Sequence, residues 1–289
     1  MGPVGVFDSG MGGLTVLREL RRRLPAEDLL YFGDTARVPY GTKGARTVRA
    51  FARQDADFLV ARGAKLVVVA CNTASAFAID DLRAALPVPV LDVIAPGVAT
   101  ALARTRGGPV GIVATRGTVE SGRYQQLLAA EIGEARVVAR PCPLFVPLAE
   151  EGLLDHPVTR RMAEEYLAPL REAGVDTLIL GCTHYPLLKG VIGEVMGPDV
   201  ALVDSAEALS VAAAQELTRR GLRRPEGAGR AAARNEGRIE FYLSDLPWKF
   251  REVGALFLGR PIDEVHTVNV NEAAWDGGLA GIPARKETP

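Results

Sequence analysis

Short apolar runs alternate with longer amphipathic stretches along almost the whole chain. The apolar runs, which predict strands, lie at residues 4–7, 29–32, 66–70, 90–93, 110–113, 135–139, 177–180 and 200–203. Between them, apolar residues recur at helical spacing, for example over residues 14–24, 45–62 and 158–173. This alternation predicts an α/β fold made of βα units, with mainly parallel sheets flanked by helices.

Two pairs of segments resemble each other within the chain. LVVVACNTASA at 66–76 and TLILGCTHYPL at 177–187 each contain an apolar strand, a cysteine and a hydroxyl-bearing opening to a helix. GVFDSG, beginning at Gly5, and GIVATRGT, beginning at Gly111, form a second pair. We interpret the pairs as two similar α/β lobes, the alternative being that both pairs merely share the pattern of a strand-to-helix turn.

The last quarter of the chain differs in composition. Residues 222–236 are rich in Arg, Gly, Ala and Pro, which predicts an exposed loop. After them, RIEFYLSD, a short helix over 250–258 and EVHTVNV predict another βαβ-like unit on the first lobe. The residues from Asn271 onward resemble a frayed tail.

Length and charge narrow the class of partner. A chain of 289 residues is expected to form two domains. With 34 basic and 35 acidic residues, it has no net field that would attract nucleic acid or an anionic membrane, so a small-molecule partner is favoured. No apolar run reaches the length of a membrane span and no secretory signal precedes Asp8, so we expect a cytoplasmic protein.

Chemistry-bearing residues collect at the predicted strand ends. Ligands of open parallel sheets bind beyond the carboxyl ends of the strands, where strand-to-helix turns expose side chains and backbone N–H groups. The polar residues that follow these ends are Asp8, Ser9, Cys71, Asn72, Thr73, Thr115, Thr118, Cys182, Thr183 and His184. We therefore expect the functional site to lie among them.

The cysteines Cys71 and Cys182 are the strongest candidates. The chain's cysteines are far apart, which favours free thiols over a disulfide framework. A helix N-terminus after each strand would stabilise a thiolate, although a buried cysteine can also act as a small hydrophobe. Cys142 lies between two prolines and is expected to be structural, whereas His184 is placed to orient or ionise Cys182 or to hold a substrate carboxylate.

The turn after the first strand allows two interpretations. Gly10, Gly12 and Gly13 do not complete the dinucleotide pattern G-x-G-x-x-G, so they indicate a tight turn with close packing or backbone donors for a small anion. Asp8 is either an ordinary turn residue or a carboxylate that binds a substrate ammonium or sets the protonation of Cys71.

At these residues the sequence resembles the glutamate racemases. FDSGMGG, YFGDTARVPYG, ACNTAS, GCTHYPLL and VDSAE occur in the order and spacing of that family. The likeness spans nearly the whole chain, including FYLSD and FLG near its end. Single motifs of this kind are weak evidence, but five in register are specific.

The resemblance implies an enzyme that interconverts L- and D-glutamate for peptidoglycan, without a cofactor or metal and as a homodimer. It implies a first lobe of residues 1–97 and 208–289, a second lobe of 98–207, and a site in the cleft between them. Carried over by position, Cys71 and Cys182 are the acid–base pair, Asp8 and His184 assist them, and Glu151 is a less certain helper. The positions that match substrate contacts are Asp8, Ser9, Tyr40, Gly41, Asn72, Thr73, Thr115, Thr118, Thr183 and His184.

Inversion at a carbon needs a base on one face and an acid on the other, which a thiolate and a thiol supply as a coupled pair. No lysine belongs to the strand-end set, which argues against a Schiff base. The alternatives are a zinc hydrolase using Cys71, Cys182 and His184, a thiol–disulfide oxidoreductase and an amino-acid-binding protein without activity. An aspartate or hydantoin racemase shares the paired-cysteine logic.

Overall fold

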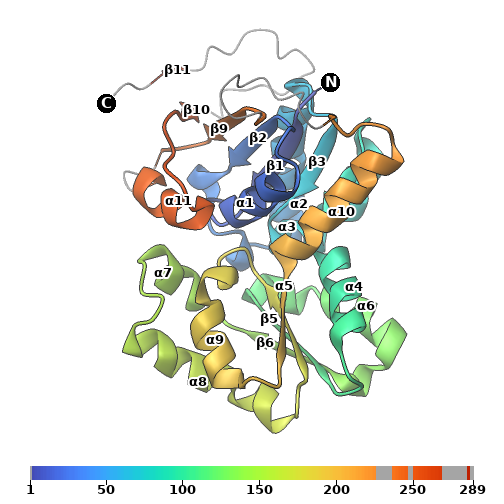
Figure 1. The fold of residues 1–289 in the computed structure, drawn as a ribbon, viewed down its shortest axis with the longest axis vertical. Helices are drawn as coiled ribbons and strands as arrows, with labels where there is room; N and C mark the ends of the chain where they lie inside the picture. Colours follow the sequence, from blue (N-terminus) through green and yellow to red (C-terminus); the bar gives the residue numbers. More distant parts are fainter. Residues whose placement is uncertain (1, 226–235, 247–249, 269–284, 287–289) are drawn as a thin grey trace.

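The computed structural model describes residues 2–225, 236–246, 250–268 and 285–286. Their strands form two sheets, one in the order β11-β10-β9-β2-β1-β3-β4 and the other in the order β6-β5-β7-β8. Figure 1 shows the two sheets as separate lobes, each flanked by helices. The predicted α/β fold with two lobes is confirmed.

The first lobe contains both ends of the described chain. Its strands are β1 (Val4–Asp8), β2 (Leu29–Gly33), β3 (Leu66–Val69), β4 (Val90–Asp92), β9 (Ile239–Leu243), β10 (His266–Thr267) and β11 (Arg285–Lys286). All its strand pairs are parallel except β10 with β11. Its helices are α1 (Leu14–Arg23), α2 (Ala45–Ala61), α3 (Asn72–Ala85), α10 (Ser205–Arg219) and α11 (Phe250–Leu258), with the 3-10 turns η1 (Thr35–Arg37) and η2 (Tyr40–Thr42).

The second lobe is entirely parallel. Its strands are β5 (Val110–Ala114), β6 (Val137–Pro141), β7 (Thr177–Gly181) and β8 (Ala201–Asp204). Its helices are α4 (Ile94–Arg104), α5 (Arg116–Glu120), α6 (Arg123–Ile132), α7 (Phe145–Glu150), α8 (Pro157–Glu172) and α9 (Lys189–Met196), with η3 (Glu134–Arg136) and η4 (Tyr185–Leu188).

The two lobes repeat one topology. The order β2-β1-β3-β4 in the first sheet corresponds to β6-β5-β7-β8 in the second. The paired segments of the sequence therefore occupy equivalent strands, β1 with β5 and β3 with β7, so that Cys71 and Cys182 follow equivalent strand ends. The predicted lobe boundaries, at 97 and 208, fall inside α4 and α10, the helices through which the chain passes between the sheets.

Strands buried on both faces hold the sheets in place. Successive side chains of a strand point to opposite faces, so Val6 packs in one core cluster with Leu17 of α1 and Phe7 packs in another with Phe58 of α2. The cluster around Val6 also contains Ile179 of β7. The apolar core is thus continuous from one lobe into the other and supports the strand ends between them.

The first residues of the loop expected over 222–236 have no regular secondary structure, but one of them, Arg224, is not exposed. Arg224 is buried because its guanidinium pairs with Asp28 at 2.7 Å and its backbone N–H donates to Glu27 at 2.6 Å. Residues 226–235 lie outside the described residues, as does the expected tail from Asn271 apart from β11. Within the described part of the chain, every helix is too short or too polar to cross a membrane.

Candidate active site

A cavity of about 330 Å³ lies between the two lobes. The first lobe lines it with Ser9, Gly10, residues 38–42, Cys71, Asn72 and Thr73. The second lobe lines it with Thr115, Arg116, Pro143, Val146, Pro147, Glu150, Cys182, Thr183 and His184. The strand-end residues that the sequence singled out are therefore brought together from both halves of the chain.

Cys71 caps the N-terminus of α3. Its sulfur accepts a hydrogen bond from Ala74 N at 3.4 Å and donates one to Ser9 Oγ at 3.6 Å. Burial and then the nearby charge of Asp8 outweigh these bonds and raise the pKa of the Cys71 thiol to about 12. The expected helix N-terminus is present and favours the thiolate, but burial and Asp8 have the larger effect, so the thiol form of Cys71 is favoured at neutral pH.

Cys182 lies in a different turn. The residues after it form the 3-10 turn η4 before α9 begins, so the α-helix N-terminus expected directly after this cysteine is not there. Its sulfur instead lies 3.8 Å from Nδ1 of His184, and both side chains are buried. The other ring nitrogen of His184, Nε2, lies 2.9 Å from Oε1 of Glu150.

His184 is thus held between two acceptors. Burial by itself lowers its pKa, but the hydrogen bonds to Cys182 and Glu150, reinforced by their charges, raise it to about 10. The imidazolium form satisfies both partners, because each ring nitrogen then carries a proton. A cation therefore stands beside the Cys182 sulfur at neutral pH and stabilises negative charge on it.

The carboxylate at this end of the cavity is Glu150 rather than Glu151. Glu150 is the last residue of α7 and lines the cavity, whereas Glu151 is exposed and lies at the C-cap of that helix. Of the two neighbouring glutamates that the sequence offers, the structure thus brings Glu150 into contact with His184, since adjacent helical residues point about 100° apart.

Asp8 lies at the end of β1 and is fully buried. Its Oδ2 accepts a hydrogen bond from Gly10 N at 3.0 Å, while Oδ1 has no hydrogen-bond partner among the described residues. Burial raises its pKa, and the charge of His184 and backbone N–H groups offset part of that effect. Asp8 therefore sits beneath the cavity floor, where it acts on both cysteine turns through its charge.

Gly12 explains the glycine run. A Cβ at this position would lie 2.2 Å from Oγ1 of Thr183 and 2.5 Å from the ring of His184. Only glycine allows the turn after β1 to approach the Cys182 turn so closely. The packing interpretation of the run therefore accounts for this glycine.

Three threonine hydroxyls join the lobes at the other side of the cavity. The distance between each pair of Oγ1 atoms in Thr73, Thr115 and Thr118 is 3.0 Å. Thr73 and Thr115 line the cavity, whereas Thr118 lies behind them and is buried. Gly41 fits against Thr115, since a Cβ there would meet the threonine Cβ at 2.8 Å.

Tyr124 is a site residue that the sequence analysis missed. It belongs to α6 of the second lobe, is fully buried, and donates a hydrogen bond to Oδ1 of Asn72 at 2.7 Å. Asn72 lines the cavity, and its amide nitrogen is a buried donor without an acceptor among the described residues.

The remaining expectations concern residues outside the cavity. Cys142 is fully buried behind β6, and His156 caps α8 by accepting a hydrogen bond from Val158 N at 3.2 Å. His266 stacks on Tyr242 with ring centroids 4.9 Å apart. Among the described residues, no three His, Cys, Asp or Glu side chains are arranged to hold a metal ion, so the zinc alternative receives no support.

Comparison with known proteins agrees with the two-lobed α/β fold. Residues 4–213 match the family model described as Asp/Glu/Hydantoin racemase. Since this match covers most of the chain, the chain belongs to the Asp/Glu/hydantoin racemase family.

Individual relatives make the likeness more specific. A glutamate racemase of Geobacter metallireducens is 51% identical over 92% of this chain and 96% of its own length. The crystal structure of Francisella tularensis glutamate racemase in complex with D-glutamate matches with a TM-score of 0.84 and 38% identity, covering 93% of this chain and 98% of that one. The Thermus thermophilus glutamate racemase structure, in complex with beta-chloro-D-alanine, matches with a TM-score of 0.82 and 46% identity over 94% and 98% of the two chains.

Proposed function

We propose that this protein interconverts L- and D-glutamate, without a cofactor, by proton transfer between the substrate α-carbon and two cysteines. The observation that supports this most strongly is that Cys71 and Cys182, which follow equivalent strands of the two lobes, line one cavity. A carbon held between them meets one sulfur on each face.

In the proposed reaction, the Cys182 thiolate removes the α-proton from one face, and the Cys71 thiol gives its proton to the opposite face. The C–H bond on one face breaks, a new C–H bond forms on the other, and the negative charge moves from one sulfur to the other. The reverse reaction uses the same groups with exchanged roles, so the cysteines titrate as a coupled pair.

The carbanion formed between these steps needs fixed positive partners. Donors that are oriented before the reaction stabilise developing charge most effectively. Asn72 supplies an Nδ2 donor without a protein partner, and the N-terminus of α3 supplies the positive end of a helix dipole. We assign Asn72 and the hydroxyls of Ser9, Thr73, Thr115 and Thr183 to substrate binding, together with the wall formed by Tyr40 and Gly41.

Glutamate is proposed as the substrate because the relatives that match nearly the full chain are named glutamate racemases. The biological role follows from that activity: D-glutamate would enter bacterial peptidoglycan, and we propose a cytoplasmic homodimer as in the family that the sequence resembles. An aspartate or hydantoin racemase, and a binding protein without activity, are the alternatives to be tested.

The deciding experiment measures D-glutamate formation from L-glutamate by the purified protein, with L-aspartate as the matched control, in deuterium oxide. We expect D-glutamate with deuterium at the α-carbon and a much slower reaction of aspartate. A protein that binds glutamate but incorporates no deuterium would be a binder, and faster turnover of aspartate would assign the other substrate.

A further inference from the structure

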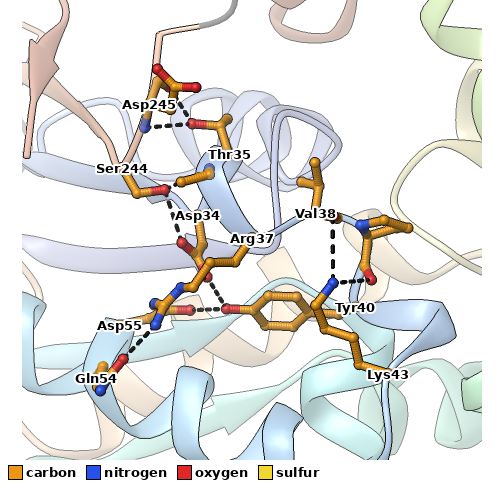
Figure 2. A network of polar contacts seen from close by, with 12 residues as sticks. Asp34, Thr35, Arg37, Val38, Tyr40, Lys43, Gln54, Asp55, Ser244 and Asp245 are labelled. Carbon is orange, nitrogen blue, oxygen red and sulfur yellow. Dashed lines mark hydrogen bonds and ion pairs between the residues drawn. The ribbon is translucent and has the colours of Figure 1, made fainter. Parts of the chain in front are cut away.

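A network of buried polar groups stands behind the wall of the cavity that is formed by residues 38–42. Figure 2 shows Asp34, Arg37, Tyr40 and Asp55 in contact with one another. Tyr40 lines the cavity, and both carboxylates are buried away from solvent. The network joins η1 and η2 to α2, and the reaction proposed above makes no use of it.

Asp34 is surrounded by donors. Its Oδ2 accepts hydrogen bonds from Arg37 Nε at 2.7 Å and from the Tyr40 hydroxyl, and its Oδ1 accepts one from Ser244 Oγ at 2.8 Å. Asp55 has fewer donors. Its Oδ1 accepts a hydrogen bond from an Arg37 terminal nitrogen at 3.0 Å, and its Oδ2 lies 2.9 Å from the Tyr40 hydroxyl oxygen.

The number of protons in this network determines which group donates to which. A phenol has one hydroxyl proton, so Tyr40 cannot donate to Asp34 and Asp55 at the same time. If Tyr40 donates to Asp34, the short contact with Asp55 Oδ2 requires a proton on that carboxyl oxygen. Two buried carboxylates beside the single guanidinium of Arg37 would also leave one negative charge uncompensated, which is costly.

We propose that Asp55 is held as a neutral carboxylic acid which donates to Tyr40, and that it is thereby the positioning residue for the 38–42 wall of the substrate cavity. In this arrangement Asp55 donates to Tyr40, Tyr40 donates to Asp34, and Asp34 forms the ion pair with Arg37. Every proton then has an acceptor, and the group carries no net charge.

The surroundings of Asp55 agree with this state. Burial and then the charge of Asp34 raise the pKa of the Asp55 carboxyl, and Arg37 offsets only part of that rise. The charge of Asp8 also raises the pKa of Asp55, with a smaller effect than that of Asp34. The negative charge of the pair therefore belongs on Asp34, which has the more numerous donors.

The wall formed by residues 38–42 also contacts the second lobe, so the network that supports it affects more than the cavity. Gly41 packs against Thr115 of the second lobe, and a Cβ at Gly117 would lie 2.9 Å from the Gly41 carbonyl oxygen. A displaced Tyr40 would therefore alter both the cavity wall and the contact between the lobes. Because this role concerns binding, it predicts a change in KM for glutamate, and in that respect it rests on the proposed function.

The test compares Asp55→Asn with Asp55→Ala. An asparagine amide can donate to Tyr40 and accept from Arg37, as the neutral acid does, whereas alanine can do neither. We expect KM for glutamate to stay within about twofold of the original in Asp55→Asn and to rise about tenfold or more in Asp55→Ala, with a smaller change in kcat. Asp57→Asn is the control, because Asp57 lies on the same helix but pairs with Arg53 on the surface.

Infrared spectroscopy of the folded protein detects directly whether the Asp55 carboxyl group carries a proton. The original protein should show the C=O stretching band of a protonated carboxyl group, and Asp55→Asn should lack it while Asp57→Asn retains it. An absent band, or an Asp55→Asn variant with the raised KM of Asp55→Ala, overturns the proposal. The band does not depend on catalysis, so it separates failure of this inference from failure of the proposed function, and it remains measurable if Asp55→Ala does not fold.

Discussion

The turns that carry Cys71 and Cys182 follow equivalent strands but surround their sulfurs with opposite charges. Cys71 caps an α-helix and lies near the carboxylate of Asp8. Cys182 is followed by a 3-10 turn and lies 3.8 Å from His184, whose pKa is raised, against burial, by hydrogen bonds to Cys182 and Glu150. The repeated topology thus places the two sulfurs alike, and the neighbouring side chains make them chemically different.

This difference matches what racemisation requires. Two thiols would lack a base, and two thiolates would repel each other and lack an acid. The carboxylate of Asp8 opposes ionisation of the Cys71 thiol. In the proposed reaction Cys71 would therefore serve as the acid, and Cys182, beside the imidazolium of His184, would serve as the base.

Replacing either cysteine should have the largest effect. In Cys71→Ala or Cys182→Ala, one face of the substrate has no proton donor or acceptor, so racemisation should fall by at least about 10³-fold. The measurement is the rate of D-glutamate formation from L-glutamate. Cys142→Ala is the matched control, since Cys142 is buried outside the cavity and its loss should leave the rate within about threefold. A Cys71→Ala variant that racemises at the original rate would end the two-thiol scheme.

Thiol alkylation tests the asymmetry itself. Only a thiolate reacts readily with iodoacetamide. Because the pKa of Cys71 is raised to about 12, its thiolate is scarce at neutral pH, and Cys182 should be modified about a hundredfold faster. The comparison is made by mass spectrometry of the protein after short exposures. Faster labelling of Cys71 would reverse the assignment of acid and base.

Much of this arrangement was predictable from the pattern of the chain. Both cysteines follow runs of Val, Leu and Ile long enough to identify buried parallel strands, and a parallel sheet brings its strand ends to one edge. The sequence therefore predicts the strand-end residues of the cavity, from Ser9 to His184, and the repeat that relates the two lobes.

The residues that the sequence did not reveal lie on helices. Glu150 and Glu151 are adjacent and chemically identical, and only the rotation of α7 decides which one meets His184. Tyr124 reaches the cavity through a contact with Asn72, which lies far away in the sequence. The sequence does indicate Asp8 and His184 as neighbours of the cysteines. It does not give the balance of effects on Cys71, because burial and the charge of Asp8 outweigh the local effect of the helix N-terminus.

Glu150→Gln should produce a moderate effect that depends on pH. The hydrogen bond and charge of Glu150 help to raise the pKa of His184 to about 10, against the lowering effect of burial. The imidazolium is present below that pKa and lost above it. Removing the carboxylate lowers the pKa, so the alkaline fall in kcat should move to lower pH, and activity near pH 9 should drop about tenfold.

The control for this change is Glu151→Gln, which removes the same charge one residue away on an exposed side chain. Its pH–rate profile should overlay that of the original protein. If both variants moved the alkaline limb equally, the effect would be a general change of field, and the contact between Glu150 and His184 would have no special role.

Tyr124→Phe should give the smallest effect and the most specific one. The tyrosine hydroxyl fixes the Asn72 amide by donating to its oxygen, and the amide nitrogen remains a buried donor without an acceptor among the described residues. Without that bond the amide oxygen loses a buried partner, at a cost of about 1–2 kcal/mol, and the amide is free to turn its oxygen toward the substrate carboxylate. We therefore expect kcat/KM for glutamate to fall roughly fivefold, with most of the change in KM. Tyr166→Phe, in the same lobe, removes a hydroxyl that accepts a hydrogen bond from the backbone N–H of Leu144, and it should leave both constants unchanged. Equal values for the two variants would mean that Asn72 keeps its orientation without Tyr124, and that the difference between the two cysteine turns alone organises the substrate.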